Sequence, residues 1–298
     1  MTFQTQDGVR YRMPIVFGPS SSPRQHPDGR MWTLEETGRM RAEWGAIRVR
    51  AQRDQLEALL PPGFSLRGEP TMVVNCAWFH DLFWLAGRGY GILSIEIATT
   101  YRGKTETIEG NFCPVLWEGE PDAIMTGREE LGFPKMFAKF APFALDEATG
   151  AASFAASWFD HTFFEAQFSD LVEVADPDKV MPGSGGFPSL FYKYMPRTAP
   201  FGKGGADVAY ATTAAPQARP GENVATIPMD GVDFRKWTGS GAFKWNRATF
   251  QDNPLGFHVI NGLAGIDVGE VLDVEFVKFS GPGIIISGAA TMRAVEPA

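Results

Sequence analysis

Cysteine and histidine are scarce in this chain of 298 residues, which has two cysteines and four histidines. Cys76 and Cys113 each stand alone in an apolar, strand-like run without a CxxC spacing, so we expect buried free thiols in a reducing compartment. No histidine has a partner four residues away or a nearby carboxylate at ligand spacing. Each histidine is therefore expected to be structural, and neither a metal nor an organic cofactor is predicted. The four are His26, His80, His161 and His258.

Long apolar runs and excess positive charge are also lacking. No run approaches the roughly 20 apolar residues that span a bilayer, and the first residues lack the basic-then-apolar order of a signal peptide. The 27 Lys and Arg are outnumbered by 35 Asp and Glu, for a net charge of −8. This charge argues against nucleic acid or an anionic membrane as a partner. A cytoplasmic protein with a small-molecule partner is expected.

Motifs for nucleotides and for serine nucleophiles are missing. The glycine-rich segment 87–91 precedes a strand-like run, whereas a dinucleotide loop follows a strand and opens a helix. No GxSxG elbow or phosphate loop occurs. The chain therefore lacks the commonest sequence signatures of dinucleotide-binding enzymes and serine hydrolases, and neither class is predicted.

Apolar and aromatic residues are plentiful, with a hydrophobic fraction of 44%, 24 Phe and 8 Trp. Alternating runs recur every ten to fifteen residues with turn residues between them. This pattern predicts a β-rich α+β protein, built as an antiparallel barrel or sandwich with a few short helices. The expected strands include 44–50, 71–80, 91–101, 105–117, 151–168 (as a bent strand or hairpin), 190–195, 207–213, 271–279 and 283–293. Short helices are expected at 54–60, 120–131 and 253–264.

The first 43 residues differ from the rest, because they are polar and rich in turn residues. We expect them to form an N-terminal arm that is either loose or wrapped over a neighbour. Residues 44–298 are expected to form a single catalytic domain.

One lysine lies in an unusual setting. Pro134 fixes its own φ and moves Phe133 toward extended geometry, so the preceding helical run should stop near Gly132. Lys135 follows this break among aromatic and methionine side chains, where poor hydration favours the neutral amine. The alternative is a lysine whose stem covers apolar surface while its ammonium reaches water.

One glutamate interrupts an apolar strand. In the run 91–101, Leu93, Ile95 and Ile97 point one way, and Glu96 points the other way beside Ser94 and Ala98. Small residues around a carboxylate suit the lining of a cavity. The alternative is a glutamate on the wet face of a half-exposed strand.

The lysine segment, Gly127-Arg128-Glu129 followed by Phe133-Pro134-Lys135, resembles the active-site segment of the acetoacetate decarboxylase family. In that family this lysine forms a Schiff base. The spacing from Glu96 to Lys135 is similar to that between the family's catalytic glutamate and its lysine. The resemblance extends from about residue 44 to 266, through 188–196, 237–241 and 253–255.

The resemblance implies that Lys135 and Glu96 are catalytic and that no cofactor takes part. It implies that an N-terminal arginine, Arg41 or its neighbour Arg39, binds the substrate carboxylate. It also implies a homo-oligomer. Phe133, Trp117 and Met136 are expected to bind the substrate.

This chain departs from the best-known members of the family at Met136, where they carry a second lysine. Repulsion from a neighbouring cation is therefore missing, and desolvation must favour the neutral amine of Lys135. Schiff-base chemistry survives this change, but acetoacetate as the specific substrate is less firmly implied.

Three functions follow from the resemblance. The first is a Schiff-base lyase that decarboxylates a β-keto acid such as acetoacetate or a larger analogue. The second is a Schiff-base aldolase-dehydratase acting on pyruvate-like acids and aldehydes. The third is a non-catalytic binder of small ligands with the same fold, against which the presence of both Lys135 and Glu96 argues.

Overall fold

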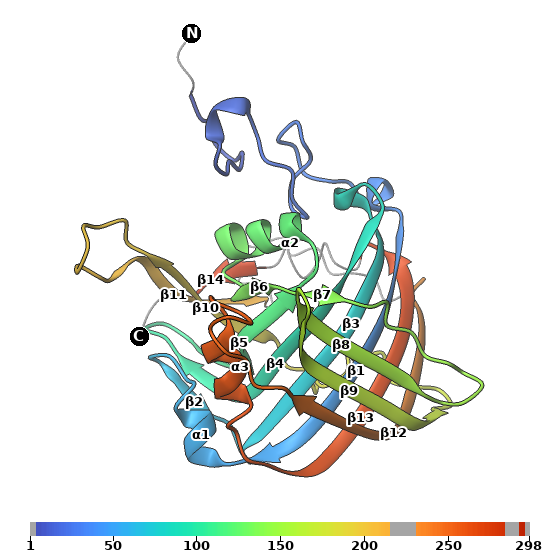
Figure 1. Ribbon diagram of the computed structural model, residues 1–298. Coiled ribbons are helices and arrows are strands. Elements are labelled where there is room, and N and C mark those ends of the chain that lie inside the picture. The colour runs from blue at the N-terminus through green and yellow to red at the C-terminus, as the bar shows by residue number, and fades with distance from the viewer. Residues whose placement is uncertain (1–3, 215–230, 284–291, 296–298) are drawn as a thin grey trace.

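The computed structural model describes residues 4–214, 231–283 and 292–295. Within them, fourteen strands form one large sheet (Figure 1). The strands are β1 (Arg39–Ala51), β2 (Phe64–Leu66), β3 (Thr71–Leu82), β4 (Arg88–Arg102), β5 (Thr107–Glu118), β6 (Lys135–Phe137), β7 (Lys139–Phe140), β8 (Ala152–Trp158), β9 (His161–Glu173), β10 (Ser189–Pro196), β11 (Ala206–Ala214), β12 (Asp233–Trp245), β13 (Val268–Pro282) and β14 (Met292–Ala294).

The strand order is β14-β11-β10-β5-β4-β3-β1-β13-β12-β9-β8-β7, with β2 paired to β4 and β6 to β5. The β-rich, mostly antiparallel fold is as predicted, with parallel pairing where β5 meets β10 and β6. A barrel was one of the two arrangements expected, and within the described residues the sheet does not close into one. The sheet curves strongly but ends at β7 and β14, which are only two and three residues long.

Alternation along the strands places the two largest hydrophobic clusters on opposite faces of the sheet. Leu93, Ile95 and Ile97 of β4 are fully buried in the larger cluster, as the sequence pattern predicted. Tyr90 and Ile92 of the same strand belong to the smaller cluster on the opposite face. Cys76 and Cys113 are both buried and free, which confirms their prediction as thiols.

The helices are short: α1 (Arg53–Glu57), α2 (Pro121–Thr126) and α3 (Phe257–Leu263), with single-turn helices η1 (Ile15–Phe17), η2 (Glu35–Thr37), η3 (Phe83–Leu85) and η4 (Gly127–Leu131). The predicted helix at 120–131 is present as α2 and η4. Pro121 begins α2 because a first-turn residue needs no N–H partner. Gly132, with φ of 84°, ends η4 in the left-handed region. No helix in these described ranges is long and apolar enough to cross a membrane.

The N-terminal arm contains η1 and η2 and lies beside α2 (Figure 1). Arg12 donates to the Ser21 carbonyl within the arm and pairs with Glu130 of η4. The pair with Glu130 attaches the arm to the α2–η4 segment. β1 begins at Arg39, so residues 39–43, assigned to the arm from sequence, belong to the sheet.

Candidate active site

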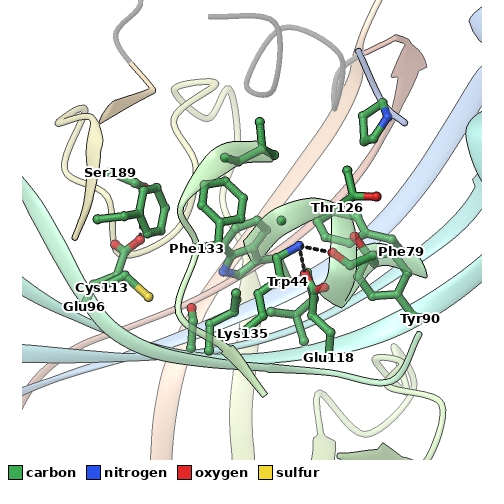
Figure 2. A pocket seen from close by; sticks show the side chains of 18 of the residues that line it. Trp44, Phe79, Tyr90, Glu96, Cys113, Glu118, Thr126, Phe133, Lys135 and Ser189 are labelled. Carbon is green, nitrogen blue, oxygen red and sulfur yellow. Dashed lines mark hydrogen bonds and ion pairs between the residues drawn. The ribbon is translucent and has the colours of Figure 1, made fainter. Parts of the chain in front are cut away.

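A cavity of about 270 Å³ lies on the side of the smaller hydrophobic cluster, between the sheet and the α2–η4 segment (Figure 2). Most of its wall is apolar and aromatic, and its polar groups are few. The lining residues are Pro23, Trp44, Phe79, Trp84, Tyr90, Ile92, Ser94, Glu96, Cys113, Leu116, Glu118, Ala123, Thr126, Gly127, Leu131, Phe133, Lys135, Ser189 and Phe191.

Strand register fixes the order of side chains along the cavity. Tyr90, Ile92, Ser94 and Glu96 share one face of β4, because side chains alternate along a strand. Ile92 pairs with Glu118, and Ser94 pairs with Leu116. Leu116 in turn pairs with Lys135 of β6. The lysine therefore stands level with Ser94, between an aromatic end at Tyr90 and an acidic end at Glu96.

Lys135 is buried, with 6% of its side chain exposed, and its Nζ lies 2.8 Å from Glu118 Oε1. The same Nζ donates to the Ala123 carbonyl at 3.0 Å. The ring centroid of Phe133 is 5.0 Å from Nζ. Figure 2 shows the amine and Glu118 meeting inside the cavity. The lysine stem thus runs from its own strand toward the aromatic end.

Glu118 is more deeply buried than its partner, with 2% of its side chain exposed, and its Oε2 has no hydrogen-bond partner among the described residues. Burial raises the pKa of this carboxyl, and the adjacent Lys135 only partly opposes that rise. A buried carboxyl with a raised pKa therefore lies in direct contact with the Lys135 amine.

Gly127 is the wall against which the lysine packs. A Cβ at this position would lie 2.3 Å from Lys135 Cε and 2.6 Å from Nζ. Its backbone is ordinary right-handed helix, with φ −64° and ψ −41°, so conformation does not require glycine. The close approach of the lysine stem does require it.

Glu96 lies at the opposite end of the cavity. Its Oε1 accepts a hydrogen bond from Ser189 Oγ at 3.2 Å. Burial raises the pKa of Glu96 to about 7, while the Ser189 hydrogen bond and the charge of Arg48 act in the other direction. Near neutral pH this carboxyl exchanges between its acid and base forms, as a proton-transfer group must.

Comparison with known proteins places the chain in a family. The family model described as acetoacetate decarboxylase matches residues 12–250. The chain belongs to the acetoacetate decarboxylase family. A search of curated proteins finds no match.

Solved structures of this family and its relatives share the fold. A structure from studies of acetoacetate decarboxylase has a TM-score of 0.60 at 15% identity, covering 87% of this chain and 90% of that one. Acetoacetate decarboxylase from Legionella pneumophila subsp. pneumophila str. Philadelphia 1 has a TM-score of 0.59 at 19% identity, covering 86% and 90%. The enduracididine biosynthesis enzyme MppR, complexed with pyruvate, has a TM-score of 0.57 at 16% identity, covering 82% and 86%.

Three of the six site residues predicted from sequence line the cavity: Lys135, Glu96 and Phe133. Trp117 and Met136 do not. They alternate with Glu118 and Lys135 along β5 and β6, so their side chains point to the opposite face, where both pack in the larger cluster.

Arg41 does not line the cavity either. It lies in β1 with 60% of its side chain exposed, and its Nε donates to Asp81 at 2.8 Å. The Asp81 carboxylate raises the pKa of this guanidinium. Arg39, the alternative, is also exposed and pairs with Asp233. Neither arginine therefore reaches the lysine in this arrangement.

Sequence reasoning missed Glu118, Gly127 and Ser189 as members of the site. Glu118 is level with Ile92 only because β5 pairs with β4, and such a register is not written in either strand alone. Ser189 comes from β10, 93 residues from Glu96 in sequence. Within the described residues no group of three or more His, Cys, Asp or Glu side chains could hold a metal ion.

Proposed function

We propose that the chain is a Schiff-base-forming lyase that decarboxylates a β-keto acid without a cofactor. The observation that carries the proposal is the Lys135 amine, buried in an apolar cavity 2.8 Å from a carboxylate oxygen of Glu118. A keto acid is the proposed partner. A homo-oligomeric assembly and a cytoplasmic location remain predictions.

The reaction begins with a proton transfer from the Lys135 ammonium to Glu118. The neutral amine attacks the ketone carbon, and the carbinolamine loses water to leave a protonated imine. The bond between the α-carbon and the carboxylate then breaks. Its electron pair forms an enamine with the iminium as electron sink, and CO₂ leaves. Protonation of the α-carbon and hydrolysis of the imine release the ketone and return Lys135.

Glu96 is proposed to handle the proton at the α-carbon or to help dehydrate the carbinolamine. Its pKa of about 7 lets it act as acid and as base near neutral pH. General acid–base catalysis of this kind typically contributes about 10²- to 10⁴-fold in rate. Ser189, which donates to Glu96, orients the carboxyl.

Charge in the cavity favours decarboxylation over the aldolase-dehydratase reaction. Among its described lining residues, Lys135 is the only cation, while Glu96 and Glu118 are acids. A carboxylate that stays on the substrate through every step needs a lasting counter-charge once the protonated imine becomes a neutral enamine. A carboxylate that leaves as CO₂ loses its charge in the reaction. The pyruvate complex of MppR keeps the aldolase-dehydratase as the second candidate.

The proposal is tested by borohydride reduction in the presence of keto acids, read by intact mass, together with CO₂ release. Wild-type protein should gain the mass of the reduced imine and release CO₂, and Lys135→Ala should do neither. Trapping without CO₂ would favour the aldolase-dehydratase. No trapping with any keto acid would leave a ligand-binding protein of this fold.

A further inference from the structure

We infer that the substrate is a β-keto acid whose ketone carries a bulky apolar group, at least the size of a phenyl ring, on the side away from the carboxylate. This inference rests on the proposed function, because it takes Lys135 as the atom that binds the ketone carbon. Three observations support it: the composition of the cavity wall, its volume, and the order of its residues relative to the lysine amine.

Aromatic side chains line the cavity on both sides of the lysine amine. Six aromatic side chains line the cavity, from β1, β3, η3, β4, the segment before β6, and β10. They are Trp44, Phe79, Trp84, Tyr90, Phe133 and Phe191. A methyl group, as in acetoacetate, would contact few of them. An aromatic or branched alkyl group would remove much more apolar surface from water, at about 25 cal/mol per Å².

The volume points the same way. The cavity of about 270 Å³ approaches the lower end of the range for drug-sized ligands, roughly 300–1,000 Å³. A four-carbon keto acid would leave much of this space to water against apolar walls. Empty or wet apolar space binds a larger apolar ligand better than a small one.

Strand register decides where the group lies. Trp44 pairs with Ala77, which pairs with Ile92, and this row continues to Glu118. The next row toward the start of β4 joins Phe79 to Tyr90. Glu96, four residues beyond Ile92, is displaced along β4 by about 13 Å in the opposite direction.

The lysine amine meets Glu118, so it lies level with the Trp44 row and beside the Phe79–Tyr90 row. Figure 2 shows Phe79 and Tyr90 on the Glu118 side of the amine, and Glu96 and Ser189 on the other side. A ketone carbon bonded to Nζ would therefore extend its apolar group between the aromatic rings. Its α-carbon and carboxylate would point toward Glu96.

The test compares kcat/KM for acetoacetate and 3-oxo-3-phenylpropanoate, with the spontaneous loss of CO₂ subtracted. The phenyl substrate should be preferred by about tenfold or more, since even one methylene in an apolar pocket is worth about 10- to 200-fold. An equal or greater kcat/KM for acetoacetate would overturn the inference while leaving the proposed function intact. Failure to trap either substrate with borohydride would instead overturn the proposed function.

A matched pair of variants locates the preference. Phe79→Leu should lower the phenyl-to-methyl ratio of kcat/KM severalfold, because Phe79 lines the cavity. Trp78→Leu, its neighbour on β3, is the control, since Trp78 packs against the larger cluster on the other face and should leave the ratio unchanged. A ratio that falls equally in both variants would count against the aromatic end as the binding site. The wild-type comparison decides the inference should Phe79→Leu fail to fold.

Discussion

Gly127 offers a way to displace the lysine without touching it. In Gly127→Ala the new Cβ would lie 2.3 Å from Lys135 Cε, 2.5 Å from Cδ and 2.6 Å from Nζ. These atoms are the far end of a flexible side chain, so the lysine can move while the backbone stays. The movement must break at least one of the contacts that Nζ makes with Glu118 and the Ala123 carbonyl.

The effects on activity and stability should therefore separate. A misplacement of about 1 Å at a reacting centre costs roughly 10²-fold in rate, and kcat should fall by at least that factor. Stability changes little, because overpacking costs about 1–3 kcal/mol and alanine in a helical position recovers about 1 kcal/mol relative to glycine. The net change in unfolding free energy is then within about 2 kcal/mol.

The assay measures kcat, borohydride trapping and urea unfolding for Gly127→Ala beside a matched control. Gly262→Ala is that control, because Gly262 lies in α3 with no atom within 4 Å of an added Cβ. It should keep full activity and gain up to about 1 kcal/mol. Wild-type kcat and trapping in Gly127→Ala would refute the close packing of the lysine against this wall.

Three further predictions concern the charged groups. Glu96→Gln should lower kcat by about 10²- to 10⁴-fold while still permitting some trapping on Lys135. Because the folded pKa of Glu96, about 7, lies above its ordinary 4.5, wild-type stability should fall as pH rises between these values. Above pH 7, urea unfolding should therefore give the variant a higher unfolding free energy than wild type, by at most about 3 kcal/mol at 1.4 kcal/mol per pH unit. Below pH 4.5 the two unfolding free energies should show no such difference. Glu118→Leu and Lys135→Met should each lower the unfolding free energy by about 3–5 kcal/mol. The double variant should be more stable than either single variant, because it leaves no unpaired buried charge. Strictly additive losses of unfolding free energy in urea would contradict this. Arg41→Gln should leave KM for a keto acid unchanged and cost under about 1 kcal/mol, because it removes only the exposed pair with Asp81; a large rise in KM would return Arg41 to the site.

Much of the fold was predictable because the central strands are long apolar runs whose side chains alternate between the two faces of the sheet. The alternation of Leu93, Ile95 and Ile97 fixed which way Glu96 points. The proline break at Pro134 located the end of η4. Closure of the sheet was not predictable, because it depends on the length of the edge strands and on pairings between distant segments.

The site was predictable only in part, for a related reason. Lys135 and Glu96 carry local signals: a break among aromatic residues, and a carboxylate among small ones. Trp117 and Met136 were expected to bind the substrate, but neither lines the cavity, because the two-residue period of a strand turns them to the other face. Glu118 joins the site through pairing between strands, which no single segment encodes.

The central claim, that Lys135 forms the imine, is tested most directly by locating the reduced adduct. Protein treated with 3-oxo-3-phenylpropanoate and borohydride would be digested, and the modified peptide sequenced by mass spectrometry. Lys193 is the internal competitor, because burial lowers the pKa of its amine. The account predicts the adduct on Lys135 alone. An adduct on Lys193 or Lys139, or full labelling of Lys135→Ala, would contradict it.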